Sequence, residues 1–272
     1  MLHKEKIMKF KGFCIELYLF FMANLKSTVF GAYLLTVLML AKVFEFEFIS
    51  RYDLIFLAAI TFQLVFLIFK LEKLKEFGVI FLFHIVATLM ELFKTNPEIG
   101  SWSYPYLDET FFKLATVPLF TGFLYSAVGS YMSRAQRFLN LEYENFPKKV
   151  HLWTASICIY INFFTHHYIY DFRYILLVYL LYIFRKTIIS FKVYKKRRGM
   201  NLLCSTILVS LFMWIAENIG TMTKTWLYPH QNGQWELVSI QKMGSWFLLL
   251  ILSFALVSLV YEKKIYKNNL QI

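Results

Sequence analysis

The sequence has few charged residues and few residues that interrupt helices. Only 17% of its 272 residues are Asp, Glu, Lys or Arg, and it contains 5 prolines and 10 glycines. Because soluble globular proteins are about 25% charged, this composition argues against a soluble enzyme, a disordered chain or a nucleic-acid-binding module. The three cysteines, Cys14, Cys158 and Cys204, have no paired spacing, which argues against a disulfide framework or a cysteine zinc site.

Long apolar segments make up most of the chain. Hydrophobic residues are 58% of it, and the mean hydropathy is +0.53. A helix needs roughly 20 apolar residues to cross the hydrocarbon core of a bilayer. Eight segments approach that length: 28–44, 52–70, 76–94, 111–132, 150–167, 172–191, 201–219 and 243–261. We therefore expect an all-α, polytopic membrane helix bundle of about eight transmembrane helices, forming a single integral-membrane domain over residues 1–272.

Residues 1–27 differ from these segments because charges interrupt their apolar run. Four lysines between positions 4 and 11 precede the apolar stretch 13–22, as they would at the start of a signal peptide. Glu16 lies within that stretch and Lys26 follows it. This pattern favours an interfacial N-terminal helix over a cleaved signal.

Lysine and arginine are distributed unevenly among the expected loops. With the N-terminus inside, the inner loops and the two termini hold most of the 29 basic residues. Because cytoplasmic loops are enriched in Lys and Arg, we expect a multi-pass protein of the bacterial inner membrane with both termini in the cytoplasm. The net charge of +12 then lies against lipid headgroups, so the lipid bilayer is the expected partner and nucleic acid is not. The sequence does not predict an oligomeric state.

Polar side chains within the expected spans gather toward their outer ends. They are His84 and Glu91 on segment 76–94, Asn162 and His166 on segment 150–167 with His167 and Asp171 just beyond it, and Glu217 and Asn218 on segment 201–219. Such residues are costly in a membrane and usually face a cavity or a partner. The pattern predicts nothing comparable at the inner ends, where charge is expected only in loops.

Two of the outer loops share a motif. They read Glu91 … Ile-Gly-Ser-Trp102-Ser-Tyr104-Pro and Glu217-Asn-Ile-Gly-Thr … Trp226-Leu-Tyr228-Pro. Four expected crossings separate them, so both face the same side, which favours a four-plus-four parallel repeat with halves 28–132 and 150–261. The alternative interpretation is convergence, because Gly and Pro punctuate loops while Trp and Tyr prefer membrane interfaces.

Longer stretches make the sequence resemble a known family. They are Glu91-Leu-Phe-Lys-Thr, Gly100-Ser-Trp-Ser-Tyr-Pro105, Ala127-Val-Gly-Ser-Tyr131, Asn162-Phe-Phe-Thr-His-His167, Ala216-Glu-Asn-Ile-Gly220, Trp226-Leu-Tyr-Pro229 and Lys242-Met-Gly-Ser-Trp246. Together they are similar to the bacterial integral-membrane family catalogued as domain of unknown function number 817. This resemblance implies a multi-pass bacterial membrane protein and brings no activity with it.

A weaker likeness is to membrane carotenoid cyclases and hydratases. It rests on a carboxylate placed before a loop that carries Gly, Trp and an aromatic-Pro pair. The chain departs from those cyclases at residues 117–123, which read Val-Pro-Leu-Phe-Thr-Gly-Phe where the cyclases carry a paired acidic run.

The first functional hypothesis is an acid/base enzyme acting on a lipid or polyprenoid at an outward-side pocket. Glu91 and Glu217 would be general acids, because partial burial raises a carboxyl pKa. The other candidate catalytic residues are His166 and His167 as bases and Asp171 and Asn218 as orienting partners. The candidate substrate-binding residues are His84, Trp102, Tyr104, Trp226 and Tyr228. We expect no cofactor, and the histidine spacing does not favour a metal.

Two other functions fit the same residues. Intramembrane carboxylates, histidines and a parallel repeat also suit a proton-coupled transporter or permease of a small or lipid-like solute. Polar residues that continue inward past His84 and Asn162 would favour transport, whereas a closed inner end would favour an enzyme. In a structural membrane protein, the same side chains would only hydrogen-bond between helices.

Overall fold

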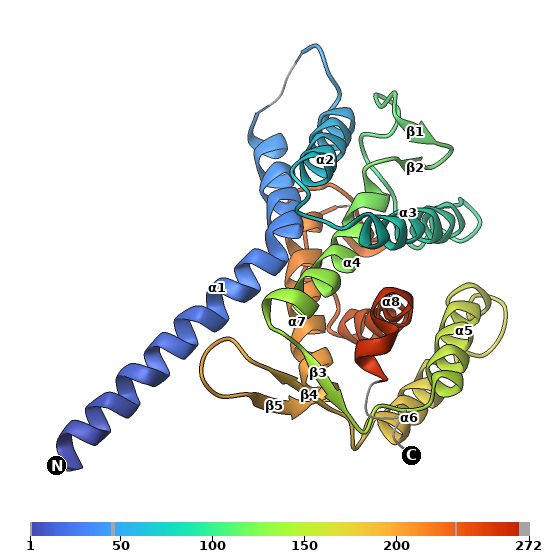
Figure 1. Cartoon of the computed structure of the whole chain (residues 1–272). Helices are drawn as coiled ribbons and strands as arrows, with labels where there is room; N and C mark the ends of the chain where they lie inside the picture. Colours follow the sequence, from blue (N-terminus) through green and yellow to red (C-terminus); the bar gives the residue numbers. More distant parts are fainter. Residues whose placement is uncertain (1, 45–46, 232, 267–272) are drawn as a thin grey trace.

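The structure, a computed structural model, describes residues 2–44, 47–231 and 233–266. Its described part is mostly helical and carries two small antiparallel sheets (Figure 1). The helices are α1 (Leu2–Val43), α2 (Arg51–Ile68), α3 (Leu74–Lys94), α4 (Thr121–Phe138), α5 (Lys149–Thr165), α6 (Arg173–Phe184), α7 (Leu202–Met222) and α8 (Gln241–Ile265), with a 3₁₀ turn at Pro229–Gln231. The strands are β1 (Lys113–Leu114), β2 (Val117–Pro118), β3 (Glu142–Glu144), β4 (Ile188–Phe191) and β5 (Arg198–Asn201).

Five helices in the described residues are long and apolar enough to cross a bilayer. They are α2, α3, α7, α8 and the Phe10–Val43 part of α1, while α6 is a shorter apolar helix. The expectation of a mostly helical protein is confirmed, and these five helices are candidate membrane spans. The first helix continues from Leu2 to Val43 without a break near residue 27, and its N-terminal part projects away from the other helices (Figure 1). An interfacial position for residues 1–27 stays a prediction.

The predicted helix over residues 111–132 is wrong over residues 111–120. Residues 113–118 form the β1–β2 hairpin, and α4 begins only at Thr121. The Asp53 carboxylate holds the start of the hairpin by accepting bonds from the backbone N–H groups of Phe111 (2.9 Å) and Phe112 (2.8 Å). Pro118 has no N–H to donate to a helix, so a strand end suits it better than a helix interior.

The predicted helix over residues 172–191 is also too long. The helix α6 ends at Phe184, and β4 then pairs with β3 on one side and with β5 on the other. The β-branched run Thr187-Ile188-Ile189 suits a strand. In the basic run that follows, Arg197 bonds Glu142 (2.8 Å) and Arg198 bonds Glu16 (2.7 Å), so this run is tied to the protein itself.

The connections between helices gather at two opposite ends of the bundle. At one end, here called the outer end, Ser103 pairs with Leu227, and Lys94 contacts the turn after α5. At the other end, the inner end, the β3–β4–β5 sheet brings the α4–α5 and α6–α7 connections together. The chain therefore runs back and forth between these two ends.

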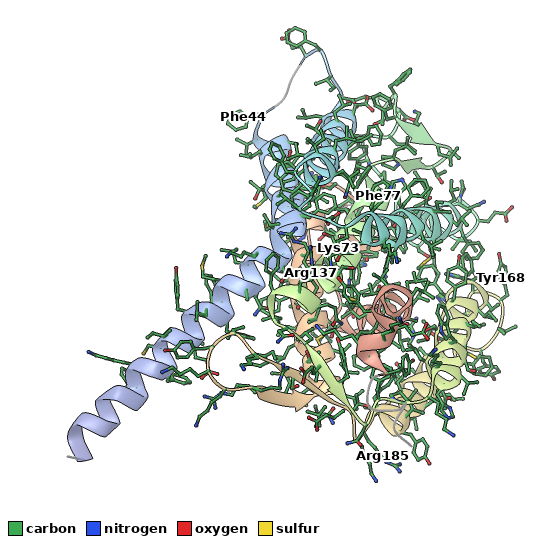
Figure 2. The ribbon with its side chains drawn as sticks, viewed as in Figure 1. Phe44, Lys73, Phe77, Arg137, Tyr168 and Arg185 are labelled. Atoms are coloured by element: carbon green, nitrogen blue, oxygen red, sulfur yellow. The ribbon has the colours of Figure 1, made fainter. Side chains whose placement is uncertain are left out.

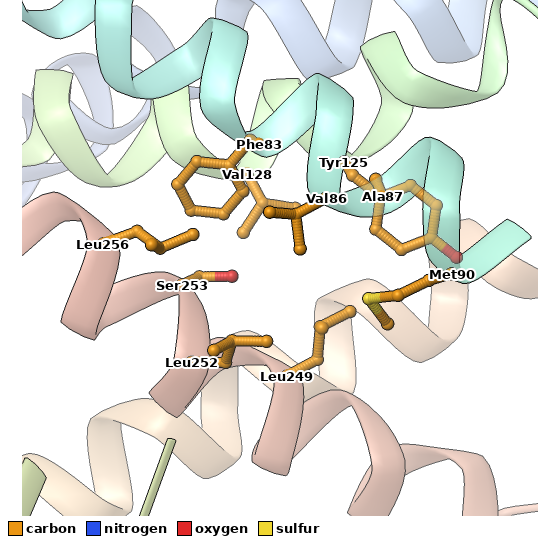
Figure 3. Close-up of a pocket in the computed structure, with 10 residues that line it drawn as sticks. All are labelled: Phe83, Val86, Ala87, Met90, Tyr125, Val128, Leu249, Leu252, Ser253 and Leu256. Carbon is orange, nitrogen blue, oxygen red and sulfur yellow. The ribbon is translucent and has the colours of Figure 1, made fainter. Parts of the chain in front are cut away.

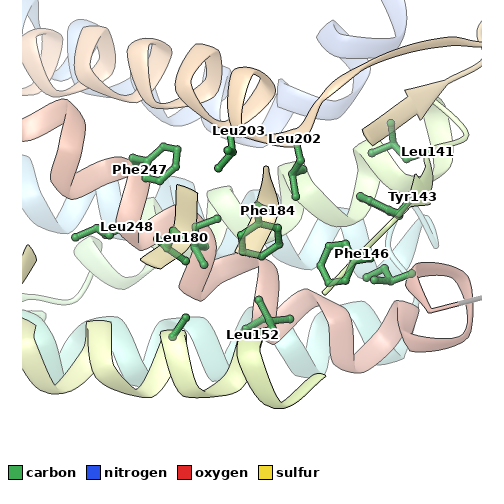
Figure 4. Packing of buried hydrophobic residues seen from close by; sticks show 14 of the residues in the cluster. Leu141, Tyr143, Phe146, Leu152, Leu180, Phe184, Leu202, Leu203, Phe247 and Leu248 are labelled. Atoms are coloured by element: carbon green, nitrogen blue, oxygen red, sulfur yellow. The ribbon is translucent and has the colours of Figure 1, made fainter. Parts of the chain in front are cut away.

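The helix α4 lies at the centre of the bundle and packs against α1, α3 and α8 (Figure 1). A large apolar core fills the space between α5, α6, α7 and α8. Figure 4 shows side chains of this core facing one another: Leu152, Leu180, Phe184, Leu202 and Phe247. In water, burying each such side chain contributes about 1.5–3 kcal/mol, whereas within lipid the gain comes from close packing.

Candidate functional site

Glu91 lies in the last turn of α3 and is only 2% exposed. Its Oε2 accepts hydrogen bonds from Trp102 Nε1 (2.9 Å) and the Tyr104 hydroxyl (2.6 Å). Its Oε1 accepts one from the Tyr125 hydroxyl of α4 (2.8 Å). Hydrogen bonds to a charged acceptor contribute about 1.5–3 kcal/mol each, so this carboxylate holds the loop of the first motif firmly in place.

Glu217 has an equivalent position near the end of α7 and is 7% exposed. Its Oε1 accepts hydrogen bonds from Trp226 Nε1 (3.0 Å) and from the Tyr228 hydroxyl. Its Oε2 accepts one from Trp246 Nε1 of α8 (3.0 Å). Each glutamate thus binds the Trp and Tyr of its own Trp-x-Tyr motif and one aromatic donor of the helix that follows.

The two glutamate sites lie against each other. Ser103 and Leu227, the central residues of the two motifs, exchange both backbone hydrogen bonds at 2.9 Å. The Trp102 and Tyr228 rings meet edge to face with their centroids 6.3 Å apart. The rings of the two helix donors, Tyr125 and Trp246, are 6.1 Å apart, and the two carboxylates are close enough to repel each other.

The two sites differ in what their donors can do. A tyrosine hydroxyl can donate or accept a hydrogen bond, whereas an indole N–H can only donate. Among the described residues, Oε1 of Glu91 is hydrogen-bonded by the Tyr125 hydroxyl alone, so a proton on that oxygen could be donated to Tyr125 after the hydroxyl rotates. Both oxygens of Glu217 face an indole N–H, from Trp226 on one side and Trp246 on the other. The geometry therefore accommodates a proton on Glu91 more easily than on Glu217.

Both motif tyrosines remain protonated donors. Burial, reinforced by the neighbouring Glu91, raises the pKa of Tyr104 well above its usual range. Burial and the neighbouring Glu217 do the same to the pKa of Tyr228. Neither phenol is thus an acid at neutral pH, and both serve to position the carboxylates.

A layer of basic groups lies outward of the carboxylates. Lys94, three residues after Glu91, is 3% exposed, and its Nζ contacts Nε2 of His166 (3.3 Å) and of His167 (2.6 Å). Lys242, near the start of α8, places its Nζ 4.2 Å from the ring centroid of Tyr228 and 5.6 Å from that of Trp102. The predicted histidines therefore contact Lys94 rather than either glutamate.

Both histidines in this layer are neutral at neutral pH. Burial, followed by the Lys94 charge, lowers the pKa of His167 to about 4. Burial also lowers the pKa of His166. Because Nδ1 of His166 lies 2.9 Å from the Asn162 carbonyl, it carries the ring proton and Nε2 accepts from Lys94.

Asp171 is held by its neighbours at the start of α6. Its carboxylate accepts from Asn162 Nδ2 (3.1 Å) and pairs with Arg173 Nε (2.5 Å). Partial burial opposes ionisation, but the Asn162 bond and then the Arg173 backbone and side chain outweigh it and lower the pKa of Asp171. Asp171 therefore remains ionised and orients Arg173.

Two predicted residues lie outside this cluster. His84 lies two turns inward of Glu91, where its ring packs edge to face on Phe123. The ring also lies close against Gly122, since a Cβ added to that glycine would be only 2.3 Å from Nδ1 of His84. Asn218 donates to the Trp214 carbonyl (2.8 Å) and accepts from Val238 N–H (2.9 Å). His84 thus packs α3 against α4, and Asn218 fastens the loop before α8.

The sequence motifs did not identify four residues of the cluster, which are Tyr125, Trp246, Lys94 and Lys242. The signal for the first two is present, because each follows its Trp-x-Tyr-Pro motif in the first turns of the next helix. The two lysines lie in the stretches Glu91-Leu-Phe-Lys-Thr and Lys242-Met-Gly-Ser-Trp246, which carry the family resemblance but gave them no role in the site. Within the described residues, no group of three or more His, Cys, Asp or Glu side chains could hold a metal ion.

The expectation that the inner end carries only loop charge is wrong. Glu72 and Glu76 are 4% and 0% exposed. Glu72 accepts from Gln63 Nε2 (2.8 Å) and from the Ser130 hydroxyl, whereas Glu76 pairs with Arg137 (3.3 Å). Arg137 also reaches back to the α2–α3 turn, where it donates to the carbonyl of residue 71 (2.9 Å; Figure 2). A second carboxylate cluster therefore exists on the inner side.

Apolar helices surrounding two clusters of buried carboxylates define a helical protein of the membrane type. The chain belongs to the family described as "Protein of unknown function (DUF817)", whose model matches residues 16–254. It is 37% identical over 238 residues to "Uncharacterized protein YoaT" of Bacillus subtilis (strain 168), covering 88% of this chain and 89% of that protein. No solved structure matches the chain. The family expected from the sequence is thereby confirmed.

Proposed function

We propose that this chain is a proton-coupled permease of a small or lipid-like solute, built from two related halves of four membrane-crossing helices. In this proposal Glu91 takes up the proton, and Glu217 stays ionised beside it. The protein would lie in the bacterial inner membrane with both termini in the cytoplasm. The carboxylate pair would then face the outer side.

Three observations support two related halves. The fourth helix of each half packs on the first and third of that half, which are α1 and α3 for α4, and α5 and α7 for α8. Each glutamate lies near the end of the third helix, and its third donor comes from the fourth. The mutual Ser103–Leu227 bonds have the form that a local two-fold axis between the loops would produce.

The observation that carries the transport proposal is a row of buried polar groups along α4. Ser126, which donates to the carbonyl of Ile80 (3.2 Å), and Ser130, which donates to Glu72, are 1% and 0% exposed. With Gly122 and Arg134 they recur every four residues, so they share one face of the helix. This row lies between His84 and the inner carboxylate cluster, in the direction that a proton path from Glu91 would take.

An enzyme acting on a lipid or polyprenoid is the second candidate, and an apolar crevice favours it. This crevice lies between α3, α4 and α8 beside Tyr125, the residue that donates to Glu91 (Figure 3). Met90, Val128 and Leu252 are among the side chains that line it. The crevice has a volume of about 20 Å³, so it would have to widen to admit an acyl or prenyl chain. The end of such a chain would lie next to the Tyr125–Glu91 pair, which would then act as the acid without a cofactor.

Charge movement after a pH jump tests the permease proposal. The protein is reconstituted into liposomes on a solid-supported membrane, and the external pH is lowered stepwise. We expect a transient inward current from proton binding at Glu91. The current should disappear in Glu91→Gln and persist in Glu98→Gln, whose side chain is on an exposed loop. An equal current in Glu91→Gln would refute the proposal.

Lipid profiling tests the second candidate separately. Bacillus subtilis lacking YoaT is complemented with this chain or with its Glu91→Gln variant, and the lipids and isoprenoids of both strains are compared. An accumulated lipid or isoprenoid in the variant strain, together with an absent proton current in liposomes, would favour the enzyme. If Glu91→Gln changes neither the proton current nor the lipid profile, a structural role in the membrane is the function that is left.

A further inference from the structure

We propose that the basic layer at the outer end binds a phosphate-type oxyanion, carried either by a lipid headgroup or by a soluble solute. The outer basic layer consists of Lys94, Lys242, Arg173, His166 and His167. This inference rests on the proposed function, because it assigns the chemical class of what the permease carries.

Lys94 is the central group of the argument. Its side chain is buried, and within the described residues its polar contacts are two neutral imidazole nitrogens, with no carboxylate at ion-pair distance. Lys242 and Arg173 lie close enough to repel its charge further, and only Asp171 attracts it. A buried ammonium group without a paired anion favours its neutral form, so a bound oxyanion would stabilise the charged form.

The neighbouring cations make the layer suitable for a dianion. Arg173 already pairs with Asp171, so its charge is largely compensated. The charge of Lys242 is attracted by Glu217, but within the described residues Lys242 forms no ion pair at contact distance. Its Nζ lies over the rings of Tyr228 and Trp102. Two lysines are therefore available to one ligand, which suits a phosphate or sulfate group better than a single carboxylate.

The turn after α5 separates the buried Lys94 from the surface. His167 is exposed, as are Tyr168 and Tyr170 beside it, and Tyr168 projects outward in Figure 2. An anion that approaches from the outer side would therefore meet this turn first and would reach Lys94 by displacing side chains of the turn.

Proton and anion binding would assist each other at this place. The charged and titratable groups around Lys94 and Lys242 are Glu91, Glu217, Asp171, Arg173, His166, His167, Tyr104, Tyr125 and Tyr228. The histidines are neutral and the phenols protonated, so Glu91 and the buried Lys94 are the members whose charge can change. Protonation of Glu91 removes one negative charge beside Glu217, the carboxylate that attracts Lys242, and by linkage the anion bound at Lys242 then favours the proton equally.

Sulfate titration of the purified full-length protein tests the site. Sulfate is the probe because it stays a dianion at every pH used, and chloride at matched ionic strength is the reference. Binding is followed by tryptophan fluorescence, since Trp102 lies under Lys242. We expect wild-type binding to weaken at least tenfold in Lys94→Gln and in Lys242→Gln, which corresponds to about 1.4 kcal/mol.

The matched control is Lys113→Gln. Lys113 lies on the exposed outer hairpin, where its Nζ contacts only the carbonyls of residues 107 and 108 among the described residues, so its loss should leave sulfate binding unchanged. Without sulfate, Lys94→Gln should melt at the wild-type temperature or above it, because an uncompensated buried charge is removed. If Lys94→Gln does not fold, Lys242→Gln decides the question.

The source of the anion and its link to Glu91 are tested with the same assay. In nanodiscs, phosphatidylglycerol should weaken sulfate binding relative to phosphatidylcholine if a headgroup is the ligand, and should not if the ligand is soluble. At pH 7.5, Glu91→Gln should bind sulfate more tightly than the wild type. The proposal is overturned if the wild type binds no sulfate, or if both lysine variants bind it as the wild type does. Because these readouts need no proton current, they can fail independently of the permease proposal.

Discussion

The Glu91 and Glu217 sites use the same residue types in the same order, yet they are not chemically equivalent. Three aromatic donors reach each carboxylate, and two of them come from a Trp-x-Tyr motif. The third donor is Tyr125 at the first site and Trp246 at the second. The hydroxyl of Tyr125 can switch from donating a hydrogen bond to Oε1 of Glu91 to accepting one from it. The indole of Trp246 can only donate to Oε2 of Glu217.

This difference shows that two similar halves can give two neighbouring carboxylates different chemical roles. A carboxylate with an indole N–H on each oxygen is stabilised as the anion, because an indole cannot accept a proton in return. A carboxylate with one oxygen bonded by a hydroxyl alone can change its protonation state without leaving a buried group unpaired. The first site is therefore suited to binding a proton and the second to keeping a constant charge next to Lys242.

The largest expected effect comes from replacing each glutamate by glutamine. In Glu217→Gln the new amide NH₂ must face an indole N–H on either side, and we expect a loss of about 3 kcal/mol in unfolding free energy. In Glu91→Gln the NH₂ can donate to a reversed Tyr125 hydroxyl, so we expect about 1 kcal/mol. Unfolding of the detergent-purified variants measures both, with Glu98→Gln as the exposed control. Equal losses would remove the distinction between the two sites.

A smaller effect sharpens the similarity of the two motifs. Tyr104→Phe and Tyr228→Phe each remove one hydrogen bond to a buried carboxylate, and we expect each to cost about 2 kcal/mol. Tyr170→Phe is the matched control, because its side chain is 88% exposed and should change nothing. If one motif variant unfolds like the wild type while the other is strongly destabilised, the loops do not play corresponding roles.

Local patterns predicted the parts of the site that are close in sequence. The Trp-x-Tyr motifs did lead to the residues that bind Glu91 and Glu217, because a repeated order of rare residue types is informative by itself. Tyr125 and Trp246 were not predicted as donors, since their contacts depend on how α4 and α8 return beside α3 and α7. The inner cluster was missed because Glu72 and Glu76 lie in and just after a short turn, where sequence alone indicates solvent.

Hydropathy predicted the long, continuously apolar helices better than the helix at the centre. The long apolar runs of α2, α3, α7 and α8 correspond to observed helices. In contrast, α4 is surrounded by other helices and carries Ser126, Ser130 and Arg134, so its apolar signal is weak and its start was misplaced. The end of α6 was misplaced because a strand of β-branched residues continues the same apolar run.

The smallest expected effect is the pH dependence of stability in the basic layer that borders both glutamates. The pKa of His167 is about 4 in the folded protein and about 6.5 in an unfolded chain. Between these values the unfolded state binds more protons, so the stabilisation present above pH 6.5 is lost as the pH falls toward 4. Because His167 is solvent-exposed, we expect His167→Gln to raise the melting temperature at pH 4.5 by only on the order of 1–2 °C, with no change at pH 7.5. The exposed His151→Gln is the control, and a gain of the same size there would show that the surroundings of His167 are not the cause of the effect.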